Sequence, residues 1–328
     1  MFFLKFIFYN IHLVLRSFFC LKKTEKKGVQ FINYIEAKND VKLENDAIKK
    51  AAKFQSIQQF FINDNFTGLY GRNTNEYEQL SNKYYFIMSG LYDDLVDQKL
   101  LTASELDTLF ESPEKVNQNN SKEKLLATIH LKLLNRVNDI QKYKEVLKNI
   151  HKAQKDSLIQ FDKNISIDEI MSITKRKGGY SLLMCRHYLN LNSSKLMDDC
   201  WYNLGGVIQM TNDLFDIYKD NQENIYTFAN RTDSYITAKK LFDNQVDLFK
   251  KSLKDLAYVD SKKQKLLIQL SIIPAFGYIA LDNLAKIQNK NKQLPNLRLL
   301  ERKQLIIDME NPINIIKLLK HSYRIANN

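Results

Sequence analysis

Two short acidic segments contain the residues whose types and spacing could do chemistry. In the first segment, Asp93, Asp94 and Asp97 form a DDxxD cluster inside an apolar, aromatic stretch. Asp93 and Asp97 are four residues apart, so on a helix they would share one face, one turn apart. Two carboxylates at that spacing repel each other unless a cation or solvent relieves the repulsion. Taken alone, the cluster fits either a metal site or an ordinary solvated helix face.

The second acidic segment ends a glycine-containing apolar stretch, 205–220 (GGVIQMTNDLFDIYKD). Asn212, Asp216 and Asp220 follow at i, i+4 and i+8 and would share a helix face, with Asp213 displaced by about 100° from Asn212. Mg²⁺ prefers oxygen ligands, keeps several waters and is usually held by a few carboxylates together with substrate phosphates. Two facing helices with these segments could therefore hold a diphosphate through bridging metal ions.

The rest of the chain predicts the long helices that such segments need. Only nine Gly and four Pro occur in 328 residues, too few for the frequent turns of β-sandwiches, barrels or glycine-loop nucleotide folds. Apolar residues make up 44% of the chain, enough for a large core. Apolar periodicity predicts helices near 29–62, 74–101, 122–160, 166–190, 194–221, 232–256, 261–288 and 299–325.

Two polar breaks, 111–122 and 288–296, are predicted to be loops between these helices. No internal repeat or shift of composition marks a domain boundary, so we expect one all-α domain. The three cysteines are too few and too scattered for a disulfide framework or a thiolate metal site. This usage indicates a reducing compartment, and we expect a cytoplasmic protein.

The positive charge of the chain does not by itself indicate a nucleic-acid partner. Lys and Arg number 49 against 37 Asp and Glu, a net charge of +12. The lysines are spread out and mixed with acids and amides, and no zinc-finger spacing or RNA-binding signature is present. We therefore interpret the lysine runs as solvated helix faces and expect no nucleic-acid binding.

The first 21 residues are the most hydrophobic part of the chain. Polar residues interrupt this run, which argues against a transmembrane helix and against a secretory signal. On a helix, four basic side chains would lie within about 40° of one another: Lys5, His12, Arg16 and Lys23. This pattern suits the membrane interface, so we expect an amphipathic helix over 1–25 with peripheral membrane contact through 1–23. A helix that simply caps the core is the alternative.

The two acidic segments resemble the metal-binding motifs of the class I isoprenoid synthases, which include terpene synthases, trans-prenyltransferases and squalene/phytoene synthases. Asp93, Asp94 and Asp97 match the first motif, DDxxD. Residues 212–220 resemble the second terpene synthase motif, NDxx(S/T)xx(K)E, with Asp216 in place of Ser or Thr and Asp220 in place of Glu. Asp216 and the preceding GVIQ also resemble the corresponding segment of prenyltransferases, so the second motif is a hybrid.

A basic segment before the second motif adds to the resemblance. Lys177 and the glycine pair 178–179 are similar to the KT(A/G) segment of prenyltransferases, where a basic group touches the diphosphate. Adjacent glycines weaken a helix by about 1 kcal/mol each, which suggests either a bend or a close approach of two backbones. An ordinary loop-to-helix transition with solvated lysines is the alternative. Lys177, Arg176 and Lys219 are the candidate diphosphate donors.

The resemblance implies a single-domain helical bundle around a central cavity, with residues 26–328 as the catalytic domain. It implies a terpene synthase-like lyase that ionises an all-trans prenyl diphosphate, cyclises or eliminates, and releases diphosphate. Three Mg²⁺ ions are implied, two held by Asp93 and Asp97 and one by the second motif. Phe86, Tyr92 and Phe215 are candidates for an aromatic pocket that stabilises the carbocation, although aromatic residues at helical spacing more often belong to the core.

Two other functions stay open at the level of sequence. A trans-prenyltransferase would extend an allylic diphosphate with isopentenyl diphosphate, but residues 98–107, directly after the first motif, contain no arginine to hold a second diphosphate. A non-catalytic basic helical scaffold is the other alternative. The sequence is compatible with a homodimer and leaves the prenyl chain length and the product open.

Overall fold

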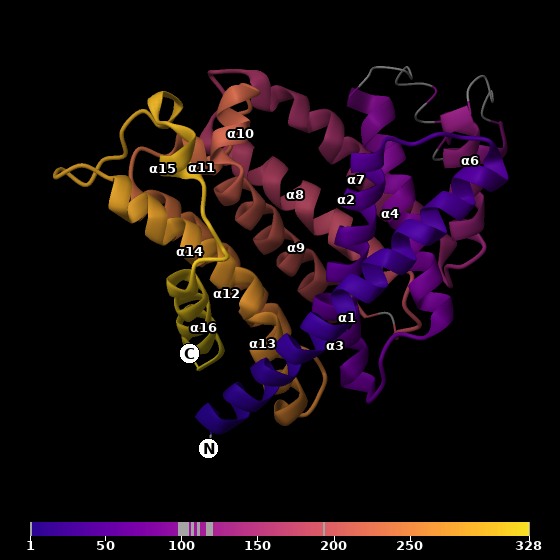
Figure 1. Cartoon of the computed structure of the whole chain (residues 1–328), viewed down its shortest axis with the longest axis horizontal. Coiled ribbons are helices and arrows are strands. Elements are labelled where there is room, and N and C mark those ends of the chain that lie inside the picture. The colour runs from indigo at the N-terminus through magenta and orange to yellow at the C-terminus, as the bar shows by residue number, and fades with distance from the viewer. Residues whose placement is uncertain are drawn as a thin grey trace. The chain divides into compact units, whose positions relative to one another are not determined.

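The computed structural model (Figure 1) describes residues 2–97, 105, 108, 109, 112–115, 121–192 and 194–327, and all their side chains except those of 11–19 and 93–97. Within these residues the regular structure is helical and contains no strand, which confirms the all-α prediction.

The main helices of the first half are α1 (Phe2–Asn39), α2 (Asn45–Gln58), α3 (Asp64–Thr67), α4 (Glu76–Asp97), α6 (Ser121–Leu134) and α7 (Ile140–Asp156). Those of the second half are α8 (Ile167–Arg186), α9 (Lys195–Phe215), α10 (Ile217–Gln222), α11 (Phe228–Arg231), α12 (Tyr235–Lys254), α13 (Asp260–Leu270), α14 (Ile272–Ile287), α15 (Arg302–Leu305) and α16 (Pro312–Asn327). Short one-turn helices join them at η1 (Gln59–Asn63), η2 (Gly68–Tyr70), η3 (Pro113–Lys115), η4 (Ser157–Phe161) and η5 (Leu297–Leu299).

Several predicted helices are interrupted. The helix expected over 29–62 is wrong because α1 ends at Asn39: Asp40 has a left-handed backbone with φ of 51°, and the Glu36 carboxylate accepts a hydrogen bond from the Leu43 N–H at 2.7 Å. The helix expected over 299–325 begins later, at Pro312, because the fixed φ of proline and its missing N–H suit a first helical turn. The segments 122–160 and 261–288 are each divided into two helices. The loop predicted at 288–296 is confirmed, whereas most of 111–122 lies outside the described residues.

The chain forms two compact units. Unit 1 consists of Met1–Tyr9, Asn149–Leu183 and Ser193–Asn328, and unit 2 of Asn10–Lys148 and Met184–Asn192. The chain passes from one unit to the other within α1, within α7, within α8 and at 192–193. The expectation of one catalytic domain over 26–328 stays a prediction.

Helix α9 is the centre of unit 1. Its side chains Trp201 and Leu204 are fully buried, as are Phe242 and Phe249 of α12. Helices α12 and α14 both pack along α9, and α16 packs on α14 and α13. The end of α9, where the second acidic segment lies, is therefore held on a well-packed core.

Unit 2 is built around α4, which packs against α2 and α6. At the start of α4, the Glu78 carboxylate is 1% exposed. It accepts two hydrogen bonds of 2.7 Å from the Arg72 guanidinium, and one each from the backbone N–H groups of Asn75 and Asn190 at 2.8 and 2.7 Å. This half-buried ion pair and the bond from Asn190 tie the start of α4 to the segment after α8.

One helical stretch among the described residues, 260–287 in α13 and α14, is long and apolar enough to cross a membrane by length and composition. In the structure, 61% of its most apolar window is buried. A core helix of a soluble protein passes the same test, so this stretch is weak evidence for a membrane span.

Candidate functional site

The second acidic segment lies at a kink between α9 and α10. Helix α9 ends at Phe215, and Asp216 leaves the helical region with φ of −94° and ψ of 9°. Backbone hydrogen bonds of 2.8 Å still join Asp216 N–H to the Asn212 carbonyl and Asp220 N–H to the Asp216 carbonyl. The one-turn spacing predicted from the sequence is thus kept across the kink, with the Asn212 and Asp216 side chains exposed and Asp220 buried.

A second acid of this segment, Asp213, is also buried, and the predicted set of ligands does not include it. Its side chain is 6% exposed and accepts hydrogen bonds from Gln209 Nε2 at 3.0 Å and Thr174 Oγ1 at 3.2 Å. Burial raises the pKa of Asp213 to about 6, against the opposing effects of these hydrogen bonds and of the Lys177 charge. The sequence did contain a signal for Asp213: it precedes Asp220 by seven residues, which places the two about 20° apart around a helix.

Asp220 lies close enough to the other acids to be affected by their charges. Burial, followed by repulsion from Asp213 and Asp216, raises the pKa of Asp220 to about 8, and Lys219 opposes this rise. Two buried carboxylates that repel each other are stabilised by a bound cation. The segment therefore has the electrostatics expected of a cation site.

The oxygen donors of this segment suit a hard cation that takes its remaining ligands from water or substrate. Carboxylate and amide oxygens are what Mg²⁺ binds, usually with waters and substrate phosphates filling the remaining positions. Within the described part of the chain, no group of three or more His, Cys, Asp or Glu side chains is arranged to hold a metal. The second segment fits a site of few protein ligands, not a closed protein cage.

The three predicted diphosphate donors have different surroundings. Lys177, half-buried on α8, acts electrostatically on Asp213, and Lys219, exposed on α10, acts on Asp220. Lys219 also lies 3.9 Å from Glu223. Arg176 is engaged elsewhere, because its Nη1 forms an ion pair of 2.5 Å with the Asp156 carboxylate. Lys177 and Lys219 are therefore the cations that act on the acidic segment.

The glycine pair marks a close approach of two backbones, not a bend. Helix α8 is continuous through Gly178 and Gly179. A Cβ atom on Gly178 would collide with the carbonyl oxygen of Gly205 on α9, and a Cβ on Gly205 would collide with the carbonyl oxygen of Gly178. Of the alternatives drawn from the sequence, the close approach is the one observed. It allows Thr174 of α8 to reach Asp213 of α9.

The DDxxD cluster lies in the last turns of α4, so its helical setting is as predicted. The side chains of Asp93, Asp94 and Asp97 lie outside the described residues.

The predicted aromatic residues lie in both units. Tyr92 of unit 2 is buried, and Phe86 of the same helix borders an apolar cavity of about 20 Å³ between α2 and α4, room for about one water molecule. In unit 1, Phe215 is half-buried, with its ring centroid 6.3 Å from that of Phe276 on α14. These surroundings resemble ordinary core packing, and the role of the three residues in a pocket stays a prediction.

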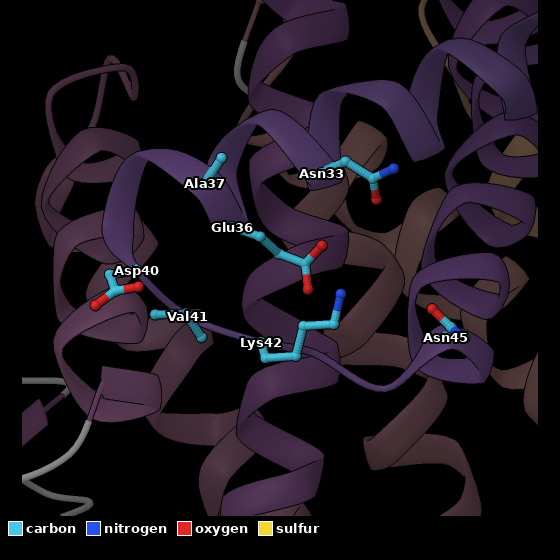
Figure 2. A pocket seen from close by; sticks show the side chains of 7 residues that line it. All are labelled: Asn33, Glu36, Ala37, Asp40, Val41, Lys42 and Asn45. Carbon is cyan, nitrogen blue, oxygen red and sulfur yellow. The ribbon is translucent and has the colours of Figure 1, made fainter.

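A larger hollow lies at the turn between α1 and α2 in unit 2 (Figure 2). It measures about 510 Å³ and is lined by Asn33, Glu36, Ala37, Asp40, Val41, Lys42 and Asn45. Glu36, its buried carboxylate, already closes the turn through the Leu43 N–H. None of the residues predicted from the sequence lines this hollow, so it adds nothing to the acidic site.

No protein-family model matches the chain, and no curated protein shows significant similarity to it. The resemblance to the isoprenoid synthases is thus limited to short motifs.

Proposed function

We propose that this protein is a Mg²⁺-dependent, terpene synthase-like enzyme that ionises an all-trans prenyl diphosphate and releases diphosphate after cyclisation or elimination. The observation that supports it best is the buried pair Asp213 and Asp220 beside Lys177. Buried carboxylates are costly unless a cation or hydrogen bonds compensate them, and a diphosphate substrate needs both cations and basic donors. Acids and lysine occur here within the segments that resemble the family motifs.

In this proposal the second segment holds Mg²⁺ through Asn212, Asp216 and Asp220, with Asp213 as an added candidate. Asp93, Asp94 and Asp97 are ligands predicted from the sequence alone. When bound, Mg²⁺ neutralises charge on the leaving diphosphate and so favours cleavage of the C–O bond.

The basic side chains bind and orient the diphosphate. Lys177, half-buried on α8 beside the acidic segment, donates charge-assisted hydrogen bonds to the diphosphate oxygens. Lys219, exposed on α10 and 3.9 Å from Glu223, is the second basic donor of the proposal. Arg176 contributes only if it leaves Asp156, an ion pair already formed in the structure.

The direct test measures Mg²⁺-dependent diphosphate release from ten-, fifteen-, twenty- and twenty-five-carbon prenyl diphosphates, with mass spectrometry of the products. Lys177→Gln should lower kcat/KM by about 10- to 100-fold, the loss of one strong charge-assisted contact. Lys175→Gln, two residues earlier on the same helix and also half-buried, is the matched control and should keep near-normal activity. Equal activity of the two variants would remove Lys177 from the site.

One observation favours chain elongation as a second candidate, namely an acid at position 216, where prenyltransferases resemble this chain and terpene synthases do not. The same assay with added isopentenyl diphosphate separates the two candidates. A longer prenyl diphosphate would identify an elongating enzyme, whereas a hydrocarbon or alcohol would support the terpene synthase. Absence of diphosphate release from every substrate would leave the non-catalytic scaffold as the explanation.

A further inference from the structure

Unit 1 exposes large apolar side chains at both of its chain ends. On the first turns of α1, Phe3, Leu4 and Phe8 are 56%, 69% and 67% exposed. On α16, Ile316 is 66% and Leu319 40% exposed. Single exposed apolar residues are common, but adjoining ones usually mark an interaction surface.

Tyr323 of α16 connects these two groups. Its ring centroid lies 5.7 Å from those of Phe2 and Phe3 and 5.1 Å from that of Phe6. Phe6 is buried with Ile268 of α13 and Ala326 of α16, which anchors the start of α1 on unit 1. Figure 1 shows the beginning of α1 next to α16, in agreement with these contacts.

The exposed residues of α16 extend this contact into a strip. Ile316, Leu319 and Tyr323 lie within about 60° of one another around the helix, by the 100° rotation per residue. Phe3 meets Tyr323 at one end of the row. We call Phe3, Leu4, Phe8, Ile316, Leu319 and Tyr323 the apolar strip.

The charges beside the strip are positive. Lys5 lies on α1, Lys320 and Arg324 lie on α16, and Lys265 of α13 lies over the ring of Tyr9, 5.5 Å from its centroid. Residues 2–9 and α16 contain no Asp or Glu. Asp282 of α14, which packs on α16, is paired with His321 and Lys317 of α16 at 3.0 and 3.9 Å. Asp308 and Glu310 precede the first turn of α16, at the end of the helix away from Tyr323.

An apolar strip between cations matches an anionic bilayer surface, where acyl chains accept the apolar side chains and lipid phosphates attract the lysines. A second copy of the chain is a poorer occupant, because it would bring the same cations face to face. We propose that unit 1 docks on anionic membranes through the apolar strip, with α16 as half of the docking surface. The sequence predicted membrane contact for 1–23 alone, and the role of α16 is independent of the proposed enzyme activity.

The docking geometry also reconciles the two interpretations of the N-terminal helix. Phe6 caps the core of unit 1, while its neighbours on the same turns face outward. Deleting the N-terminus would remove both functions at once, so point substitutions on α16 are the cleaner test.

The test is sedimentation of the full chain with vesicles of phosphatidylcholine, with and without phosphatidylserine. The wild type should sediment only with the phosphatidylserine vesicles, and less so at high salt. Ile316→Gln with Leu319→Gln should weaken the partition coefficient about tenfold or more. Lys320→Gln with Arg324→Gln should weaken it about 30-fold, or about 2 kcal/mol at about 1 kcal/mol per cation.

The matched control is Ile236→Gln with Leu248→Gln on α12, where the side chains are 55% and 44% exposed. This variant should bind vesicles like the wild type. Undiminished binding of the Ile316/Leu319 variant would overturn the proposal, as would equal binding of the wild type to both kinds of vesicle. Failure to bind vesicles, together with a dimer in light scattering that the same variant disrupts, would identify the strip as a self-association surface instead.

Discussion

Replacing Asp220 by Asn should make the metal-free protein more stable and should remove the Mg²⁺-dependent activity that we propose. In the structure, burial and repulsion from Asp213 and Asp216 raise the pKa of Asp220 from 3.8 to about 8. A tenfold change in proton affinity corresponds to about 1.4 kcal/mol, so at pH 7 this carboxyl group lowers the free energy of unfolding by up to about 4 kcal/mol. The Asn side chain does not ionise, so the variant should recover about 1–3 kcal/mol of that cost.

The pH dependence gives the sign of this effect. Because the folded pKa of Asp220 lies above its unfolded value, the folded state binds more protons between about pH 4 and pH 8. The stability of the wild type therefore falls, relative to that of the variant, as the pH rises through this window. The advantage of Asp220→Asn should be small near pH 4 and should grow as the pH rises to 8.

The measurement is urea unfolding followed by the fluorescence of Trp201, the single tryptophan, which is fully buried in α9 of unit 1. Asp247→Asn, an exposed carboxylate on α12 of the same unit, is the control and should change stability by less than about 0.5 kcal/mol. Added Mg²⁺ should stabilise the wild type and not the Asp220 variant. A less stable Asp220→Asn protein, or an advantage that does not grow with pH, would refute the reasoning.

Two further variants test how each unit is held together. Glu78→Gln should lower the free energy of unfolding by about 1–3 kcal/mol, because it removes the charge of a buried carboxylate whose partner Arg72 is 33% exposed. Burial would raise the pKa of Glu78, but hydrogen bonds lower it below the usual 4.5, so urea titrations should show the deficit shrinking in acid. Gly178→Ala should cost about 1–3 kcal/mol because the added methyl meets the Gly205 backbone. Gly90→Ala, which meets nothing within 4 Å, should instead be neutral or stabilise by about 1 kcal/mol in the same titrations.

The sequence predicts the helices of this protein better than their ends. Apolar periodicity extends over many residues and so identifies helices despite local irregularity. The break at Asp40 depends on the left-handed backbone of this residue and on the side chain of Glu36, which accepts a hydrogen bond from the N–H of Leu43, seven residues later. The polar residues of that turn are also acceptable in a helix, so the periodic pattern continues through them. Pro312 was an explicit signal of a helix start, and the helix predicted over 299–325 did not use it.

The acidic site shows a similar division between local and tertiary information. The spacing of Asn212, Asp216 and Asp220 predicted one continuous helix, but the helix is interrupted at Asp216. Backbone hydrogen bonds one turn apart still link the three residues. Measuring rotation from Asn212 alone left out Asp213, whose proximity to Asp220 follows from the same geometry. Which acids are buried could not be predicted, because burial is decided by the helices packed against α9. The ion pair of Arg176 with Asp156, on the preceding helix, is tertiary in the same sense.

The close approach of α8 and α9 links helix packing to the charge of the site. Gly178 meets Gly205, while Thr174, one turn earlier on α8, donates to Asp213, two turns later on α9. The two helices therefore run antiparallel along this contact, and a wider spacing would withdraw both Thr174 and the Lys177 charge from Asp213. Without these partners, burial would raise the pKa of Asp213 further, and its carboxylate would be less available to a cation. The glycine pair thus affects the acidic segment by keeping α8 and α9 close together, without contacting a ligand itself.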